Sequence, residues 1–123
     1  MSKVIKHAVI YTGSEKIEDG YIRFDKQIEA VGRMSEYVCQ SSDEIVDVLG
    51  KTIVPGFIDV HSHGGYGFDT MDGNADEIDE MVNHMVCEGV TTYFATTMTQ
   101  SHQNIENALA AVKKAAEKNP VIQ

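Results

Sequence analysis

Short apolar segments separated by turn residues occupy the first fifty positions of the chain. Val, Ile, Tyr and Phe are concentrated in four of these segments, and Asp19-Gly20 and Asp25-Lys26 lie between them. Branched and aromatic side chains favour strands, whereas Gly and Asp favour turns. Strands at this spacing predict a small antiparallel sheet or sandwich. The predicted strands cover residues 4–11, 20–24, 28–31 and 45–49.

The pattern changes near Thr52. Residues 52–60 form a more apolar run, which is typical of a strand buried on both faces. Helical spacing of apolar residues then predicts a helix over about 75–88. Asn74 is its expected N-cap, Glu77 resembles the partner in a capping box, and Gly89 is a suitable stop. The apolar face of this helix contains Ile78, Met81, Val82, Met85 and Val86.

A second strand and a second helix follow. The strand is predicted over residues 90–97 and the helix over about 102–118, with Ser101 as its N-cap. Residues 120–123 look like the opening of a third strand. The apolar stripe predicted for the second helix contains Ile105, Leu109 and Val112. Strands and helices that alternate in this way predict parallel strands joined by helical crossovers.

The predicted fold class is α/β, with the first strands and helices of a TIM-like (β/α)8 barrel preceded by part of a small β-sandwich domain. Residues 1–51 are assigned to the sandwich part and residues 52–123 to the barrel part. A complete barrel needs roughly 250 residues, and only about 70 are present after residue 51, so we expect a truncated barrel. A small complete α/β domain is the alternative.

Charge and cysteine content narrow the classes of function. The net charge is −9, from 19 acidic and 10 basic residues, which argues against nucleic acid and against an anionic membrane surface as partners. No stretch approaches the about 18 apolar residues of a membrane span, and the N-terminus lacks the apolar region of a signal peptide. Cys39 and Cys87 are too few for a disulfide framework. We therefore expect a cytoplasmic protein with reduced thiols.

The residues best suited to chemistry follow the apolar run. Because side chains alternate along a strand, Asp59, His61 and His63 are expected on one face, and Ile58 and Val60 on the other, under helices. Burying unpaired polar groups costs roughly 1–3 kcal/mol each, and a metal ion would satisfy two imidazoles at this spacing. A His-x-His pair alone is a weak signal, but this one ends a strand where parallel barrels place their active sites. We predict metal ligation by the two histidines, with Asp59 as an orienting or structural group.

Three segments also resemble a known superfamily. Residues 54–64 read VPGFIDVHSHG, residues 64–72 read GGYGFDTMD, and residues 88–99 read EGVTTYFATTMT. The first segment resembles the first metal-binding strand of the amidohydrolase superfamily. The other two narrow the resemblance to the family of N-acetylglucosamine-6-phosphate deacetylases, and the resemblance covers essentially the whole chain.

The resemblance implies removal of the acetyl group from N-acetylglucosamine 6-phosphate, which gives glucosamine 6-phosphate and acetate. It implies a divalent metal ion, with zinc expected and iron, cobalt or manganese as alternatives. His61 and His63 match the family's paired ligand positions. The family's other ligands and its catalytic Asp would lie beyond Gln123, so no catalytic residue is assigned within the chain. A homo-oligomer is implied for the full-length enzyme.

Several readings remain open beside this one. Another amidohydrolase, such as a dihydroorotase or hydantoinase, and a non-catalytic truncated product are the alternatives for the function. Tyr66 and Asp69 are expected to rim the pocket or to pack within their loop, and Met98 and Thr99 could line the same pocket. The remaining histidines are expected to face solvent: His7, His84 and His102.

Overall fold

The computed structural model describes residues 2–123. They form two compact units, which meet in the sequence between Pro55 and Gly56, and each is described by itself. Neither α-helix of the described residues is long and apolar enough to cross a membrane.

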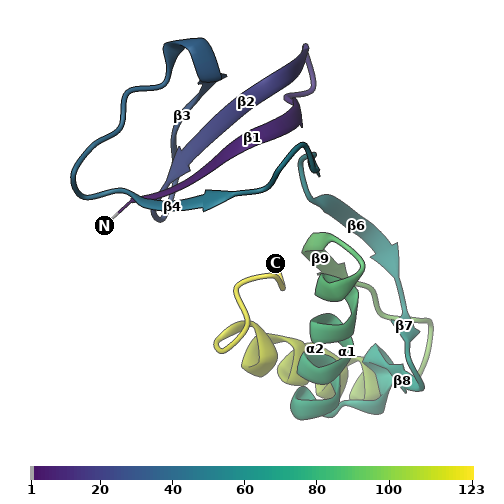
Figure 1. Ribbon diagram of the computed structural model, residues 1–123. Helices are drawn as coiled ribbons and strands as arrows, with labels where there is room; N and C mark the ends of the chain where they lie inside the picture. The colour runs from purple at the N-terminus through teal and green to yellow at the C-terminus, as the bar shows by residue number, and fades with distance from the viewer. Residues whose placement is uncertain (1) are drawn as a thin grey trace. The chain divides into compact units, whose positions relative to one another are not determined.

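The first unit is built on a five-stranded sheet (Figure 1). Its path runs β3-β2-β1-β4, and β5 also pairs with β1. The two hairpins β1–β2 and β2–β3 are antiparallel, whereas β4 and β5 run parallel to β1. The strands are β1 (Lys3–Tyr11), β2 (Lys16–Phe24), β3 (Ile28–Arg33), β4 (Glu44–Asp47) and β5 (Thr52–Ile53). The sheet is therefore mixed: the expected antiparallel pairing is found for β1, β2 and β3, and it is wrong for β4 and β5. After β3, residues 34–43 return the chain to the other edge of the sheet, where β4 pairs alongside β1 in the same direction.

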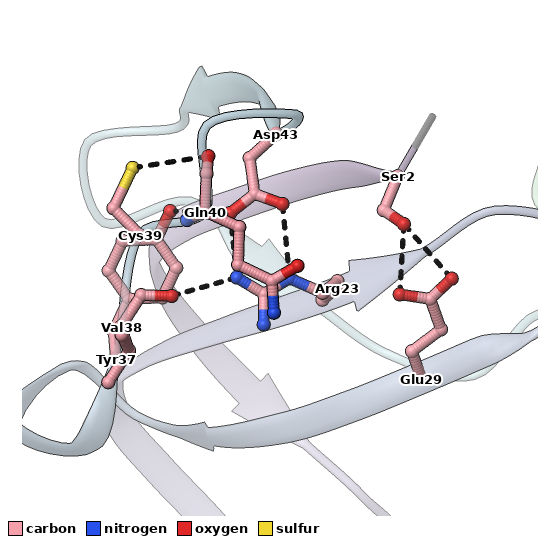
Figure 2. Close-up of polar contacts among 8 residues, drawn as sticks. All are labelled: Ser2, Arg23, Glu29, Tyr37, Val38, Cys39, Gln40 and Asp43. Carbon is pink, nitrogen blue, oxygen red and sulfur yellow. Dashed lines mark hydrogen bonds and ion pairs between the residues drawn. The ribbon is translucent and has the colours of Figure 1, made fainter.

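A buried ion pair fixes this returning segment. Arg23 on β2 donates from Nε and Nη2 to the two carboxylate oxygens of Asp43, at 3.2 and 2.6 Å, and from Nη2 to the carbonyl oxygen of Val38 at 2.8 Å. The Gln40 N–H and the Tyr37 hydroxyl also donate to Asp43 (Figure 2). The Arg23 hydrogen bond, followed by that of Gln40, lowers the pKa of the Asp43 carboxyl. A fully buried carboxylate is thus satisfied on both oxygens.

The second unit alternates strands and helices as the sequence predicts. Strands β6 (Phe57–Ser62) and β9 (Val90–Ala95) are parallel, and Ile122 continues the parallel pattern through a bridge to Tyr93. Between β6 and β9 lie a hairpin of β7 (Gly64–Gly65) and β8 (Phe68–Asp69), a 3-10 turn η2 (Thr70–Asp72) and helix α1 (Ala75–Cys87). Helix α2 (His102–Ala116) follows β9. The expected strand over residues 52–60 is interrupted at Val54–Gly56, where Pro55 has no N–H to donate to a sheet.

Both helices begin where the sequence predicts. The Asn74 side chain accepts from the N–H groups of Asp76 and Glu77, and the Ser101 hydroxyl accepts from the N–H of Asn104. The predicted face of α1 is buried except for Val86, which is 43% exposed. Helix α2 has the predicted stripe only in part, since Val112 packs against the core and Leu109 does not. Its buried residues are Ala108, Ala111 and Ala115, whereas Leu109 is 54% exposed. Alanine lets α2 pack closely against α1, so small residues make up the fully buried part of its face, beside the partly buried Val112.

Candidate functional site

An extra residue in β6 determines where its polar side chains point. Asp59 pairs with Tyr93 and Ser62 pairs with Ala95, so three steps on β6 match two on β9. This is the geometry of a β-bulge. Tyr93 and Ala95 both pack in the helical core, and paired residues of a sheet point to the same face. Asp59 and Ser62 therefore face the helices.

The carboxylate of Asp59 stabilises this bulge. One oxygen accepts from the His61 N–H at 3.0 Å and the other accepts from the Ser62 hydroxyl at 2.9 Å. Regular alternation predicted that Asp59 and the two histidines share one face of the strand. The bulge places Asp59 on the opposite face, so this prediction is wrong. Its contacts are those of a structural group, which was one of the two roles expected for Asp59, since it holds the backbone from which both imidazoles project.

The same bulge overturns the expected burial of Ile58 and Val60. These side chains are 60% and 68% exposed, and they do not lie under the helices. Ile58 pairs with Thr92, a neighbour of Tyr93 on β9, so it points to the face opposite the helical core. Simple alternation failed because the strand is irregular between Asp59 and Ser62.

His61 and His63 alternate with Ser62 and point away from the helical core. Their ring centroids are 5.2 Å apart, and the ring planes are nearly perpendicular at 80°. His61 is exposed and His63 is half-buried. The Nδ1 atom of His63 lies 3.2 Å from the carbonyl oxygen of Thr96. A carbonyl only accepts hydrogen bonds, so Nδ1 carries the proton and Nε2 keeps a free lone pair, which is the form that ligates metals.

Backbone hydrogen bonds anchor the segment that carries His63. The Tyr93 hydroxyl donates to the carbonyl oxygen of Ser62 at 3.1 Å, and the Thr70 N–H donates to the carbonyl oxygen of His63 at 2.8 Å. The Thr96 N–H also donates to the Ser62 oxygen, at 3.3 Å. Sequence reasoning did not find Tyr93 or Thr70. The available signal was a tyrosine within an apolar strand, because a buried phenol requires a hydrogen-bond partner.

The hairpin after His63 is fixed by local packing. Tyr66 and Gly67 adopt positive φ angles of 58° and 88° at its tip, and Figure 1 shows β6 leading directly into this hairpin. The Tyr66 ring stacks on His84 of α1, with centroids 4.9 Å apart. Asp69 caps the turn η2 by accepting from the Met71 N–H. Tyr66 and Asp69 were expected either to rim the pocket or to pack within their loop. The contacts described here are those of packing.

The remaining sequence candidates lie at the surface. His84 is exposed, as expected, although its ring also contacts Tyr66. His7 and His102 each lie beside a carboxylate, from Asp19 at 3.1 Å and Glu106 at 3.2 Å. Met98 and Thr99 are exposed in the segment after β9.

The chemistry available here is that of a partial ligand set. Two imidazoles suit zinc and similar divalent ions, which take nitrogen ligands in tetrahedral sites. Within residues 2–123, no group of three or more His, Cys, Asp or Glu side chains is arranged to hold a metal ion. The histidine pair therefore fits two positions of such a site.

The family model for the amidohydrolase family matches residues 52–123. The chain is 40% identical to the N-acetylglucosamine-6-phosphate deacetylase of Bacillus subtilis (strain 168), over 98% of this chain and 31% of that protein. It is 29% identical to the N-acetylgalactosamine-6-phosphate deacetylase of Escherichia coli O157:H7, over 91% of this chain and 28% of that protein. The chain thus spans less than a third of the length of these curated relatives.

A solved structure has the same fold over nearly the whole chain. It is the N-acetylglucosamine-6-phosphate deacetylase from Pasteurella multocida, with a TM-score of 0.84 and 20% identity, over 96% of this chain and 31% of that chain. The mixed α/β fold predicted from the sequence is confirmed by this similarity.

Proposed function

Because the chain belongs to the amidohydrolase family, we propose that it supplies the first metal-binding strand of a deacetylase acting on N-acetylglucosamine 6-phosphate. The pair His61 and His63 carries this proposal. Both rings project from the carboxyl end of β6 away from the helical core, and Nε2 of His63 is free to bind. The name of the Bacillus subtilis relative supports the reaction.

The proposed architecture follows from the same residues. Strands β6 and β9, together with the bridge at Ile122, would be the first three strands of a (β/α)8 barrel, in residues 52–123. The sheet in residues 1–51 would belong to a small β-sandwich domain. The parallel register of β6, β9 and Ile122 supports the barrel, since barrel strands are parallel and joined by helices.

In this proposal, the residues of the chain bind a metal ion and orient its ligands. His61 and His63 would hold a divalent ion through ring nitrogens, and the Thr96 carbonyl keeps the His63 ring in the required tautomer. Such an ion, when bound, polarises an amide carbonyl and makes water a stronger acid. Zinc is the metal we expect.

The substrate we propose is a phosphorylated amino sugar with an N-acetyl group. The name of the Escherichia coli relative makes the galactosamine isomer a second candidate. The cytoplasmic location and the homo-oligomeric state remain predictions. The isolated chain is expected to release no acetate, because two imidazoles do not complete a catalytic site.

A chimera tests the proposed reaction. These 123 residues would replace the corresponding segment of the Bacillus subtilis deacetylase, and acetate release from N-acetylglucosamine 6-phosphate would be measured. We expect activity in the chimera and a loss of at least about a hundredfold on His61→Ala or His63→Ala. Loss of a ligand should cost at least as much as the largest effect seen when only a hydrogen-bond partner of a ligand is removed. His102→Ala is the matched control and should change little, since His102 lies on α2 and is exposed. Activity that survives both ligand substitutions would contradict the proposal.

A further inference from the structure

Tyr93 is a buried core residue whose hydroxyl group forms hydrogen bonds. Its side chain is completely buried among the apolar residues of α1 and α2. Its hydroxyl donates to the carbonyl oxygen of Ser62 at 3.1 Å and lies 3.4 Å from Oγ1 of Thr70. Since the Tyr93 hydrogen is directed to Ser62, the Thr70 hydroxyl is the donor in the second contact. A phenylalanine would fill the same core space without these contacts, so packing alone does not require the hydroxyl.

Thr70 completes the arrangement from the other side. It is also fully buried, and its N–H donates to the carbonyl oxygen of His63 at 2.8 Å. The Ser62 carbonyl precedes His63 in the chain, and the His63 carbonyl follows it. Tyr93 and Thr70 therefore hold both carbonyl groups that flank the Cα of His63, and they contact each other.

The third contact acts on the ring itself. The Nδ1–H group of His63 donates to the carbonyl oxygen of Thr96, three residues after Tyr93 on the same segment. That bond requires the His63 backbone to keep its position relative to β9. If the flanking carbonyl groups move, the ring must shift away from Thr96 or lose the hydrogen bond.

We propose that Tyr93 and Thr70 form a positioning pair that fixes the backbone on both sides of His63 and so keeps Nε2 of its ring available as a ligand. This inference rests on the proposed function, because it concerns the same ligand. It assigns no chemical step to either residue. Direct hydrogen-bond partners of metal-binding histidines change metal affinity about tenfold to a hundredfold. Tyr93 acts one bond further away, so we expect a change of about threefold to tenfold on loss of its hydroxyl, the range of one hydrogen bond.

The experiment compares variants of the 123-residue chain that differ in one hydroxyl group. Tyr93→Phe removes the phenol oxygen, Thr70→Val removes the threonine hydroxyl, and Thr70→Ser retains it. Ile78→Val is the matched control, because Ile78 lies in the same core and has no polar contact. Calorimetric titration with Zn²⁺ gives the affinity, and nitrogen-15 NMR of the imidazoles in metal-free protein gives the tautomer of His63.

We expect Tyr93→Phe to weaken Zn²⁺ binding about threefold to tenfold, the effect of one hydrogen bond, and to mix the two His63 tautomers in the metal-free chain. Thr70→Val keeps the N–H that donates to His63 and removes only the hydroxyl contact with Tyr93. It should therefore shift both measurements in the same direction by less than Tyr93→Phe does, and Thr70→Ser should restore them. Ile78→Val should lower the melting temperature while leaving both unchanged. An unaltered His63 tautomer in Tyr93→Phe, or an equal change in Ile78→Val, would overturn the positioning role.

The two proposals fail separately in this design. If the wild-type chain binds Zn²⁺ no better than His61→Ala and His63→Ala, the proposed metal site fails, and the tautomer measurement still decides the positioning role. If both histidines are needed for Zn²⁺ binding but Tyr93→Phe matches the wild type in both measurements, only the positioning role fails.

Discussion

Adjacent glycines in β7 face very different surroundings, although the sequence reads simply Gly64-Gly65. A Cβ atom on Gly64 would clash with the carbonyl oxygen of Phe68, which is backbone of the paired strand β8. A Cβ atom on Gly65 would meet nothing closer than the Met85 methyl group at 3.9 Å. Gly64 is therefore required by the close approach of the two strands, and Gly65 is not.

Alanine substitution separates these two positions. We expect Gly64→Ala to destabilise the second unit by about 2–3 kcal/mol, since a backbone oxygen cannot move aside as a flexible side chain can. Gly65→Ala is the matched control and should stay within about 0.5 kcal/mol of the wild type. Urea unfolding followed by circular dichroism measures both, and equal stabilities of the two variants would refute the close-approach argument.

At the residue scale, the sequence predicted the candidate ligands better than it predicted their neighbours. His61 and His63 were identified from their spacing, and the structure brings their rings together, while their role stays a prediction. Asp59 was placed on the wrong face because a bulge leaves no local signature in residue types. The contacts of Tyr93 depend on Ser62, which is 31 positions away in the chain, so no short motif could reveal them.

The packing of α2 illustrates what periodicity can and cannot predict about an element. Caps and spacing gave the helix starts correctly, since capping is a local interaction. The buried alanines of its face were not predicted because Ala108, Ala111 and Ala115 carry little hydrophobic signal, although close contact between helices requires such small residues. Likewise, the parallel pairing of β4 with β1 depends on where residues 34–43 lead, which strand propensities do not encode.

Opposite substitutions on α2 test its orientation. Ala115 is 1% exposed, so Ala115→Leu should overpack the core and cost about 1–3 kcal/mol. Leu109→Ala should change the stability by no more than about 0.5 kcal/mol, because more than half of this side chain is already in solvent. Chemical unfolding compares the two. A large loss in Leu109→Ala with a neutral Ala115→Leu would mean that Leu109, and not Ala115, faces the core.

The loop between β3 and β4 should respond to acid through Asp43. The folded-state pKa of this carboxyl lies below its ordinary value, chiefly because Arg23 donates to it. A lowered pKa means that the carboxylate stabilises the folded state above the unfolded-state pKa of about 3.9, and that this contribution disappears as pH falls through the folded-state value.

Asp43→Asn should therefore lower the melting temperature near neutral pH and have a smaller effect in strong acid. Glu18→Gln is the matched control, because Glu18 is exposed and pairs with Lys16 at the surface. Amide NMR signals of β1 and β2 would report unfolding of the first unit over a pH series. A constant penalty for Asp43→Asn from neutral to strongly acidic pH would contradict this account of the ion pair.

For the molecule as a whole, the sequence motifs indicated the family correctly, and the alternation of elements gave the α/β class. Neither the motifs nor the alternation predicted that one face of β6 is exposed. The apolar run through Ile58 and Val60 indicated burial on both faces, because hydrophobicity reports what a strand would bury when suitable partners cover it. In this chain, only the face carrying Tyr93 meets the helices.

The uncovered face of the β6–β9 sheet should make the isolated chain self-associate. Ile58, Val60 and Phe94 are 60%, 68% and 44% exposed, and they lie opposite Tyr93 on two hydrogen-bonded strands. An adjoining set of apolar side chains in water favours association, and the net charge of −9 opposes it without covering them. We expect the average mass in sedimentation equilibrium to rise with concentration, and Val60→Thr to reduce the rise. Val46→Thr is the matched control, since Val46 is 45% exposed on β4 of the other unit and should leave the association unchanged. A monomer at every concentration, with a cooperative thermal transition, would show that this apolar face is stable in water.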